Sequence, residues 1–507
     1  MSLSLCVLSS LSAQAGNEVL FVGSSTSGST DQHAFVESAT GNVLVAAGSP
    51  FTDNCTDAVW AHSGRRLYLG QSLMNQVAQA DWNGSSPSWS TLYSAPGACY
   101  GVELDVGRNR LWTLTGASAS TRELVCIDVD INSPNYGSVL AQTAVLGTQA
   151  RERWGLSYPG NLACVPAVFL NSGGMDLVDT NPASATFLQV VASSPVPGAN
   201  SGFTFASDCA VSLDELYAYV LFTGLGQDGL AVYDIGSGTW LDFDPAPGTQ
   251  SLVFSDPIPN LMALSLDRSF AIVSGQGGAG WVARVDFDYA NPSNSTITPY
   301  QLSVPVPDCN AVSLSPEQTR AAVTSTATFL STPSELTVFD VNTGALLQNV
   351  TLSAMWNVYT TAWQDASPIA HYSTFGSGCS GSIGTPVLLP AAGSRPALGS
   401  AFDVEVSNLP FGVAAMATGL SASVTSGGLP LPFDLTVLGM PGCTQYVDAL
   451  VLDVIQSAGT TATWTWNVPS SPSLFGQEFF NQAFSLDPAA NAFGFVASNA
   501  GNGKLGY

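Results

Sequence analysis

The sequence predicts an all-β protein: a seven-bladed β-propeller followed by a small antiparallel β-sandwich. Acidic turn residues recur seven times within the first 340 residues, at intervals of 44 to 55. Each ends an apolar, β-rich run and is soon followed by Gly, Asn or Pro, which is typical of a hairpin turn. A repeat of this length built from short strands indicates a propeller. The turn residues are Glu37, Asp81, Asp128, Asp179, Asp234, Asp286 and Asp340.

The composition agrees with a folded, turn-rich protein. Of the 507 residues, 46% are hydrophobic and only 10% are charged, with 49 Gly and 30 Pro, whereas disordered chains are polar and highly charged. The net charge of −25 repels phosphate groups, so nucleic acids and anionic membrane surfaces are not expected as partners. No apolar stretch of about 20 residues occurs beyond the N-terminus, so no membrane span is expected.

The first 15 residues resemble a signal peptide. They are apolar and end in Ala13-Gln14-Ala15 before Gly16, a small-residue cleavage site, although the usual basic start is missing. The alternative is an apolar first strand. We expect a protein that is secreted or displayed on the surface of a bacterium. Removal of Cys6 leaves eight cysteines, an even number that suits an oxidising compartment.

Residues 16–366 are expected to form the propeller, with each acidic turn between the third and fourth strands of a blade. Inner strands align at Cys55, Cys99, Cys209 and Cys309, with Trp154, Leu261 and Trp356 at the same place in the other blades. The first strand, 19–23, has no inner strand before it, and the strand at 357–363 has no blade after it. We therefore expect these two strands to share one sheet and close the ring.

The C-terminal region has a different sequence pattern from the propeller region. Residues 367–378 are rich in Ser, Gly and Pro and are expected to be a linker. Residues 379–507 alternate apolar runs with Gly/Pro turns and lack the blade repeat, which predicts an antiparallel sandwich. Cys379 and Cys443 are the only cysteines of this region and are expected to form a disulfide.

The segments ALSLDRSFAIVSG, AVSLSPEQTRAAVTS and VFDVNTGALL resemble repeats of the YVTN or lactonase-like seven-bladed propellers, and the likeness covers about residues 17–366. It implies a fold and leaves the function open, since such propellers include lactonases, cofactor-dependent oxidoreductases and binding modules. The segments FGSGCSGSIGTP and LGMPGC resemble a C-terminal domain of secreted bacterial proteins, which implies a surface, assembly or secretion role.

No strong catalytic motif is present. The sequence lacks GxSxG, HExxH, a Walker loop and CxxC, and it has only three histidines, His33, His62 and His371. A triad or a multi-histidine metal site needs histidines that converge, so we expect no catalytic histidine. The propeller cysteines are expected either as buried thiols or as the bridges Cys55–Cys99 and Cys126–Cys164.

The mouth of the central channel is the best candidate for a site, because every blade contributes a residue there. Polar groups at this level could hold a metal or a polyol; alternatively they cap strand starts and hold water. The candidates are Asp53, Asn54, Asp57, Arg153, Asp208, Asn260 and Asp308.

In two acidic turns, the side-chain oxygen atoms are spaced as in a Ca²⁺ site. Ca²⁺ is therefore the one cofactor that we consider from the sequence. The two turns contain Asp128, Asp130 and Asn132 in one turn and Asp286 and Asp288 in the other. The competing interpretation is that these carboxylates cap the turns through backbone N–H groups.

The leading functional hypothesis is a secreted, non-enzymatic binding or surface-assembly protein. The propeller would present a ligand or partner face, with a protein or glycan at the cell surface as partner, and the sandwich would serve attachment or secretion. The alternative is a lactonase-type propeller hydrolase that uses channel carboxylates and a divalent cation. The scarcity of histidine favours the first, and the oligomeric state is open.

Overall fold

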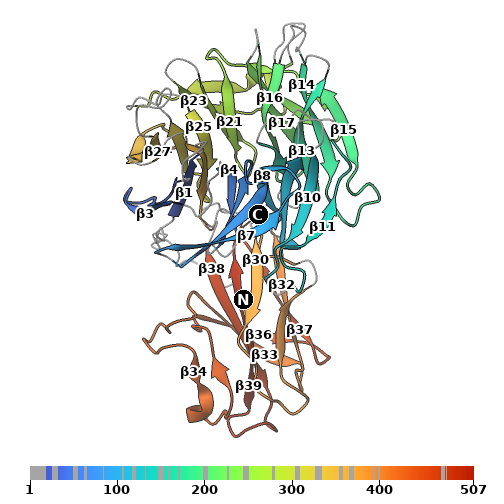
Figure 1. Cartoon of the computed structure of the whole chain (residues 1–507). Helices are drawn as coiled ribbons and strands as arrows, with labels where there is room; N and C mark the ends of the chain where they lie inside the picture. Colours follow the sequence, from blue (N-terminus) through green and yellow to red (C-terminus); the bar gives the residue numbers. More distant parts are fainter. Residues whose placement is uncertain are drawn as a thin grey trace. The chain divides into compact units, whose positions relative to one another are not determined.

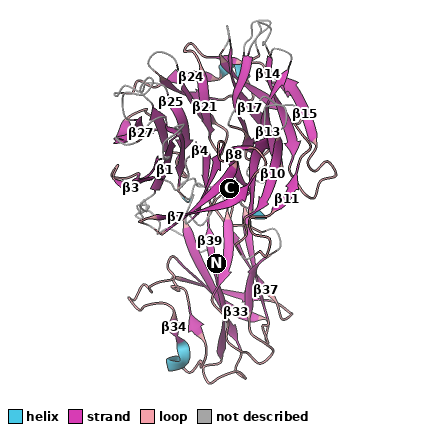
Figure 2. Ribbon diagram, in the orientation of Figure 1, coloured by secondary structure: helices cyan, strands magenta, loops and turns pink. Residues whose placement is uncertain are grey.

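The computed structural model is built almost wholly of strands, and the chain divides into two compact units, Met1–Ser367 and Pro368–Tyr507 (Figures 1 and 2). The structure describes residues 19–24, 32–48, 55–61, 66–83, 85–105, 108–116, 122–131, 133–146, 153–157, 160–169, 172–197, 204–224, 228–243, 250–276, 280–302, 309–325, 334–352, 355, 358–364, 370–391, 394–397, 400–469, 474 and 477–506. Among the described residues, no helix has the length and apolar character that a membrane crossing requires.

The described residues of the first unit form seven antiparallel sheets, and each sheet is one blade of a propeller. Blade 1 combines β29 (Val358–Trp363) with β1 (Val19–Ser24), β2 (Gln32–Glu37) and β3 (Val43–Gly48). Blade 2 holds β4 (Cys55–Trp60), β5 (Arg66–Gln71), β6 (Gln76–Trp82) and β7 (Pro87–Ser94). Blade 3 holds β8 (Ala98–Asp105), β9 (Arg110–Gly116), β10 (Glu123–Asp128) and β11 (Val139–Gln142), and blade 4 holds β12 (Gly155–Leu156), β13 (Leu162–Phe169), β14 (Ser172–Asp179) and β15 (Val190–Pro195).

The remaining blades follow in chain order. Blade 5 holds β16 (Thr204–Val211), β17 (Tyr217–Gly224), β18 (Gly229–Asp234) and β19 (Thr239–Trp240), with β20 (Leu252–Val253) also paired to β18. Blade 6 holds β21 (Pro259–Leu264), β22 (Phe270–Gly275), β23 (Trp281–Asp286) and β24 (Thr296–Pro299), with the short 3₁₀ turn η2 (Pro292–Asn294) before β24. Blade 7 holds β25 (Cys309–Leu314), β26 (Arg320–Ser325), β27 (Ser334–Asp340) and β28 (Leu346–Leu352).

The closure predicted from the sequence is confirmed. Strand β1 pairs with β29, so that Leu20 lies opposite Trp363 and Val22 opposite Thr361, although the two strands are more than 300 residues apart in the chain. Each of the seven predicted acidic turns also lies at the end of the third strand of its blade. Four of the carboxylates, those of Asp128, Asp179, Asp234 and Asp340, accept hydrogen bonds from backbone N–H groups of their turns. Asp340 Oδ1, for example, accepts from Asn342 at 3.0 Å and from Thr343 at 2.8 Å.

Tryptophans on the inner strands tie neighbouring blades together. Trp60 Nε1 in blade 2 donates to the Ala362 carbonyl of blade 1 at 3.1 Å. Trp363 Nε1 in blade 1 donates to the Ser313 carbonyl of blade 7 at 3.3 Å. Both rings are buried, so each bond satisfies a polar group inside an apolar layer between two sheets.

The second unit has a five-stranded sheet and a three-stranded sheet with an apolar layer between them. The larger sheet runs β30 (His371–Phe375), β39 (Phe495–Lys504), β38 (Glu478–Leu486), β33 (Val413–Gly419), β36 (Val451–Gln456). The smaller runs β31 (Val387–Pro390), β32 (Ala401–Ser407), β37 (Ala462–Asn467). The buried residues Phe402, Trp464 and Phe479 come from both sheets, as a sandwich requires. The predicted linker differs from the structure here, because residues 371–375 form β30 and pair with β39.

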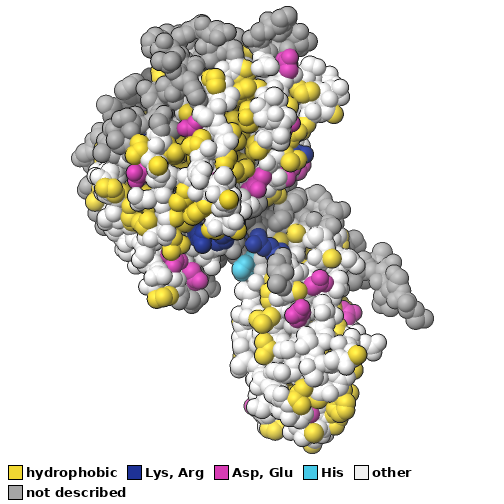
Figure 3. All heavy atoms as spheres, turned by 90° about the vertical axis from the view of Figure 1, so that its right-hand side faces the viewer, with side chains coloured by type: hydrophobic (Ala, Val, Ile, Leu, Met, Phe, Trp, Pro, Cys, Tyr) yellow, Lys and Arg dark blue, Asp and Glu magenta, His cyan; other side chains and the backbone are white. Residues whose placement is uncertain are grey.

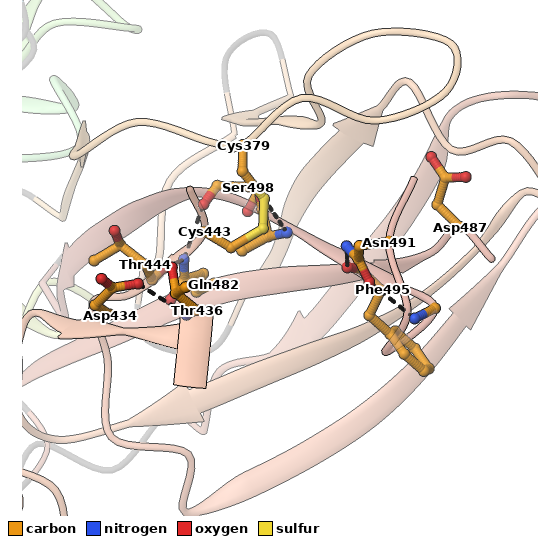
Figure 4. Close-up of a disulfide and its surroundings, with 12 residues drawn as sticks. Cys379, Asp434, Thr436, Cys443, Thr444, Gln482, Asp487, Asn491, Phe495 and Ser498 are labelled. Atoms are coloured by element: carbon orange, nitrogen blue, oxygen red, sulfur yellow. Dashed lines mark hydrogen bonds between the residues drawn. A yellow bond between two sulfur atoms is a disulfide. The ribbon is translucent and has the colours of Figure 1, made fainter. Parts of the chain in front are cut away.

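The expected disulfide is present in this unit (Figure 4). Cys379 and Cys443 are bonded, with their Cα atoms 4.9 Å apart. The bond holds the segment 433–445, which contains β34 (Phe433–Asp434), the 3₁₀ turn η3 (Leu435–Leu438) and β35 (Thr444–Gln445). Gln482 of β38 holds the end of this segment, since its Nε2 donates to the Thr444 carbonyl at 2.8 Å and its Oε1 accepts from the Tyr446 N–H.

The propeller cysteines do not form the bridges considered above. Cys55, Cys99, Cys126, Cys164, Cys209 and Cys309 are all buried thiols. The Cys55–Cys99 and Cys126–Cys164 bridges are therefore wrong, and the thiols act as small apolar groups in the layers between blades.

Candidate axial site

A β-bulge recurs at one level of the inner strands. In six of the seven blades, the pairing register between the inner strand and its neighbour skips one inner-strand residue: Thr56, Gly101, Ser207, Asn260, Asn310 and Tyr359. Blade 4 has a short inner strand of two residues, β12. A bulge bends its strand and re-aims the side chain that it carries, and bulges are frequent beside functional sites.

A cavity of about 410 Å³ lies at this level of the ring. Residues from all seven blades line it, and five of the six bulge residues are among them. Hydroxyl, amide, phenol and guanidinium groups dominate the wall. The lining residues are Thr56, Tyr100, Arg122, Arg153, Ser207, Asn260, Leu261, Gln276, Asn310 and Tyr359.

Two carboxylates lie immediately after bulges. Asp57 follows Thr56 in blade 2 and Asp208 follows Ser207 in blade 5, so the two residues are structurally equivalent. Both are almost fully buried, at 4% and 6% exposure. Such burial needs compensation, because a buried carboxylate without hydrogen-bond partners is costly.

Backbone N–H groups supply much of this compensation. Asp57 accepts from Ala58 at 2.9 Å and from Val102 of blade 3 at 3.3 Å. Asp208 repeats the pattern, accepting from Cys209 at 2.9 Å and from Met262 of blade 6 at 2.8 Å. Each carboxylate therefore joins its own inner strand to that of the next blade.

Arg153 crosses between blades at the same level. Its guanidinium in blade 4 forms an ion pair with Asp57 of blade 2. It also donates to the Tyr359 carbonyl of blade 1 at 3.1 Å and to the Thr360 hydroxyl at 3.2 Å. The guanidinium group thus connects three blades. Arg suits this role better than Lys, because its planar group carries several N–H donors in fixed directions.

The acidic groups around this cation have perturbed pKa values. Burial raises the pKa of Asp208 to about 7, against the Met262 N–H and the Arg153 charge, which favour the ionised form. Burial also raises the pKa of Asp57, opposed chiefly by Arg153. The pKa of Glu103 is raised well above its ordinary value, first by burial and then by the like charges of Asp57 and Asp208.

The structure brings together four of the seven predicted channel residues, namely Asp57, Arg153, Asp208 and Asn260. Asp53, Asn54 and Asp308 lie outside the described residues. The predicted alignment of cysteines was wrong for two blades. Cys55 and Cys309 directly precede the bulge residues of their strands. Cys99 instead lies two residues before its bulge residue, and Cys209 lies two residues after its own.

Sequence reasoning missed several members of the site. Glu103, Tyr100 and Arg122 lie on or beside blade 3, and the Arg122 guanidinium stacks 4.0 Å from the centre of the Tyr100 ring. Gln276 and Asn310 lie on the other side of the ring, where Gln276 Nε2 donates to Asn310 Oδ1 at 2.6 Å. One signal was available: Glu103 is a charged residue in the middle of the inner strand, between Val102 and Leu104.

The two candidate calcium turns have the geometry of turn caps. Asp128 Oδ1 accepts from the Asp130 N–H at 2.9 Å, and Asp288 Oδ1 accepts from the Asn291 N–H at 2.9 Å. Asp286 is paired with Arg284 at 2.8 Å. Asn132 is not among the described residues. Within the described part of the chain, no three His, Cys, Asp or Glu side chains are grouped to hold a metal ion. Calcium binding stays a prediction.

His33 and His371, the two described histidines, are in different units. His33 of β2 is buried between Phe21 and Trp89, with ring centres 5.4 and 4.9 Å away, and neither ring nitrogen has a hydrogen-bond partner. This burial lowers the pKa of His33 to about 3. His371 is half-buried on β30, and burial lowers its pKa too. His62 falls in a range that the structure does not describe.

No protein-family model matches this chain, and no curated protein matches it in sequence. Similar solved structures include the periplasmic gluconolactonase of Pseudomonas aeruginosa, at 17% identity and a TM-score of 0.49, with 68% of this chain and 99% of that chain covered. They also include a functionally unknown protein from Desulfotomaculum acetoxidans, at 14% identity and a TM-score of 0.49, with 67% and 98% covered.

A third such structure is a putative 6-phosphogluconolactonase from Bacteroides fragilis, at 14% identity and a TM-score of 0.47, with 69% of this chain and 99% of that chain covered. At these values the likeness carries no argument about activity. The strand pairing assigns the architecture: the first unit of this chain is a seven-bladed β-propeller.

Proposed function

We propose that the protein is a binding protein that holds a small polyhydroxylated ligand, such as a sugar or sugar acid, in the axial cavity. The observation that carries the proposal is the set of bulge residues lining that cavity. They present hydroxyl, amide and phenol groups from Thr56, Ser207, Asn260, Asn310 and Tyr359. A volume of about 410 Å³ is within the range of small-molecule sites. Convergent neutral donors and acceptors match a ligand with many hydroxyl groups.

The charged groups support binding rather than chemistry. Asp57 and Asp208 already accept backbone hydrogen bonds from two blades each, and Arg153 is paired with Asp57. Arg153 lines the cavity, and the two carboxylates connect neighbouring blades behind its wall. A hydrolase needs a base that is free to take a proton from water, in reach of the substrate.

One observation favours the alternative, a lactonase-type hydrolase. Burial raises the pKa of Asp208 to about 7, which suits a general base near neutral pH. Glu103 is a second such candidate, because its pKa is raised by burial and by the neighbouring acids. A divalent cation among these acids belongs to this alternative and not to the leading proposal.

We further propose that the protein is exported and that the C-terminal unit serves attachment or secretion. The Cys379–Cys443 disulfide supports this, since structural disulfides are typical of oxidising compartments. Cell fractionation of the source organism tests it: the proposal fails if the full-length protein stays in the cytosol.

Calorimetric titration with a panel of monosaccharides and aldonic acids tests the binding proposal. The variant Asn260→Ala with Asn310→Ala removes two amides from the cavity wall, while Asn349→Ala on the outer strand β28 is the matched control. We expect saturable binding of at least one sugar, weakened about tenfold or more by the cavity variant and unchanged in the control. No binding across the panel would refute the proposal.

A parallel assay separates the two functions. Ring opening of D-glucono-1,5-lactone, followed by the release of acid at constant pH, reports hydrolysis. Under the binding proposal, the rate equals that of the buffer. Turnover that is lost in Asp208→Asn and Glu103→Gln would establish the hydrolase instead.

A further inference from the structure

Strand β36 of the C-terminal unit is the last strand of its sheet. In the order β30-β39-β38-β33-β36, it pairs only with β33, and no other described strand lies against its outer edge. An open edge presents unpaired N–H and C=O groups and is a template for pairing with another strand.

The face of β36 that points away from the core is apolar. Leu452 and Val454 are 62% and 75% exposed, and their alternation places them on one face. Leu450, which is 50% exposed, lies just before the strand, where its N–H donates to the Thr418 carbonyl of β33. On the other face, Ile455 is buried in the core between the two sheets, whereas Val451 at the start of the strand is 42% exposed. The usual pattern of a half-buried strand, apolar inside and polar outside, is therefore broken on this strand. Figure 3 shows apolar side chains on the exposed surface of both units.

Strand β36 has few of the features that normally prevent an edge strand from pairing with another chain. The β33–β36 pair has no bulge, and β36 contains neither Lys nor Pro. Its single charged residue is Asp453, whose Oδ2 accepts a hydrogen bond from Trp464 Nε1 of the other sheet at 3.0 Å. This carboxylate is directed towards the neighbouring strand β37 and not across the apolar face.

Charge and register indicate which strand fits this edge. The C-terminal unit carries seven of the 37 acidic residues and two of the 12 basic ones, so most of the net charge of −25 lies in the propeller unit. Two copies can therefore approach through this unit with less repulsion than through the other. An antiparallel pair centred on Asp453 would place like charges opposite each other, which is unfavourable.

A pair centred on Leu452 avoids this conflict. Leu452 then lies opposite its own counterpart, and Val454 lies opposite Leu450, the residue just before the strand, in both directions, so the apolar side chains of this face meet. Asp453 lies opposite Val451. We propose that β36 is a self-association edge, at which β36 of a second copy of this chain pairs antiparallel in this register and joins the two five-stranded sheets. The proposal is independent of the ligand of the propeller.

Sedimentation of the full chain over a range of concentrations tests the proposal, with Leu452→Lys as the variant. Lysine on an edge strand blocks pairing, and two lysines would face each other in the proposed register. Because Lys lowers the net negative charge, global repulsion cannot explain a loss of association. Ile131→Lys, at a residue 69% exposed in the propeller unit, makes the same charge change elsewhere.

We expect wild type and Ile131→Lys to dimerise and Leu452→Lys to show a dissociation constant raised at least about tenfold, with unchanged thermal unfolding at low concentration. Added salt should strengthen the dimer, because it screens repulsion between two acidic chains. A monomer at every concentration, or a dimer unaffected by Leu452→Lys, would overturn the proposal. Dissociation by salt would also overturn it, because it would show that the two copies are held together by attraction between charges and not by this apolar edge.

A cysteine at the centre of the pair tests the register. Directly opposite residues have Cα atoms about 4.5–5.5 Å apart, within the range of a disulfide. We expect Leu452→Cys to cross-link into a covalent dimer under oxidised glutathione, while Asp453→Cys, opposite Val451, does so much more slowly. Equal or reversed rates would exclude the proposed register.

Discussion

Asp57 and Asp208 occupy equivalent positions in blades 2 and 5, and each accepts a hydrogen bond from a backbone N–H of the following blade. They differ in one contact, because the Arg153 guanidinium forms an ion pair with Asp57. Substituting each residue in turn therefore separates the effect of the shared backbone hydrogen bond from the effect of the ion pair.

The first prediction concerns Asp208. Its pKa is raised by burial to about 7 from an ordinary value of 3.8, so between these values the folded state keeps a proton that the unfolded state has lost. Stability is then lost as pH rises through this window, by up to about 4 kcal/mol. Asn cannot ionise, but its NH₂ would face one of two backbone N–H donors, at a cost of about 1–3 kcal/mol.

We therefore expect Asp208→Asn to be less stable than wild type near pH 4 and to equal or exceed it near pH 7.5, in urea unfolding at both pH values. Asp57→Asn is the comparison and should be destabilising at pH 7.5, because it leaves Arg153 without its carboxylate. An Asp208→Asn effect that does not change with pH would contradict the assignment.

The second prediction concerns His33 and the stability of the protein at low pH. Burial lowers the pKa of His33 to about 3 from 6.5, and its ring nitrogens have no partners. The folded state thus excludes a proton that the unfolded state binds, and stability is lost as pH falls from 6.5 through 3, by up to about 5 kcal/mol. His33→Phe should lower the pH of acid unfolding, followed by tryptophan fluorescence. The same acid midpoint in both proteins would show that His33 is not the group responsible.

The third prediction concerns the ion pair between Arg153 of blade 4 and Asp57 of blade 2. Arg153→Met leaves the buried Asp57 carboxylate without its cation and should destabilise the propeller by about 3–5 kcal/mol at pH 7. Adding Asp57→Asn to Arg153→Met should recover part of this loss, since no uncompensated charge remains. A double-mutant cycle by denaturant unfolding measures the coupling. Additive effects of the two substitutions would mean that the pair is energetically unimportant.

The fourth prediction concerns the disulfide. Cys379 and Cys443 are separated by 64 residues, and a loop of this length is worth roughly 4 kcal/mol in the chain-entropy model. Cys379→Ala with Cys443→Ala should lower the unfolding temperature of the C-terminal unit and leave the propeller transition in place. Calorimetry of the full chain resolves the two transitions. A matched fall in both would indicate that the units unfold together.

The sequence by itself determined the architecture, because a propeller repeat is a local pattern. Turn carboxylates such as Asp340 cap hairpins through their own next residues, so the signal is contained in a few consecutive positions. The count of seven such turns and the unmatched strands at 19–23 and 357–363 predicted the closure that β1 and β29 make. Cys379 and Cys443 could be paired because no other cysteine lies in their unit.

The axial site was decided only by the tertiary structure. A bulge is a mismatch between two strands, so Thr56, Ser207 and Asn260 are bulge residues only in relation to their partner strands. Aligning the cysteines placed Cys99 and Cys209 out of register, because packing in apolar layers tolerates a thiol at several levels. The burial that shifts the pKa values of Glu103 and Asp208 likewise arises only when seven blades close around one axis, which brings distant charges into a space with little water.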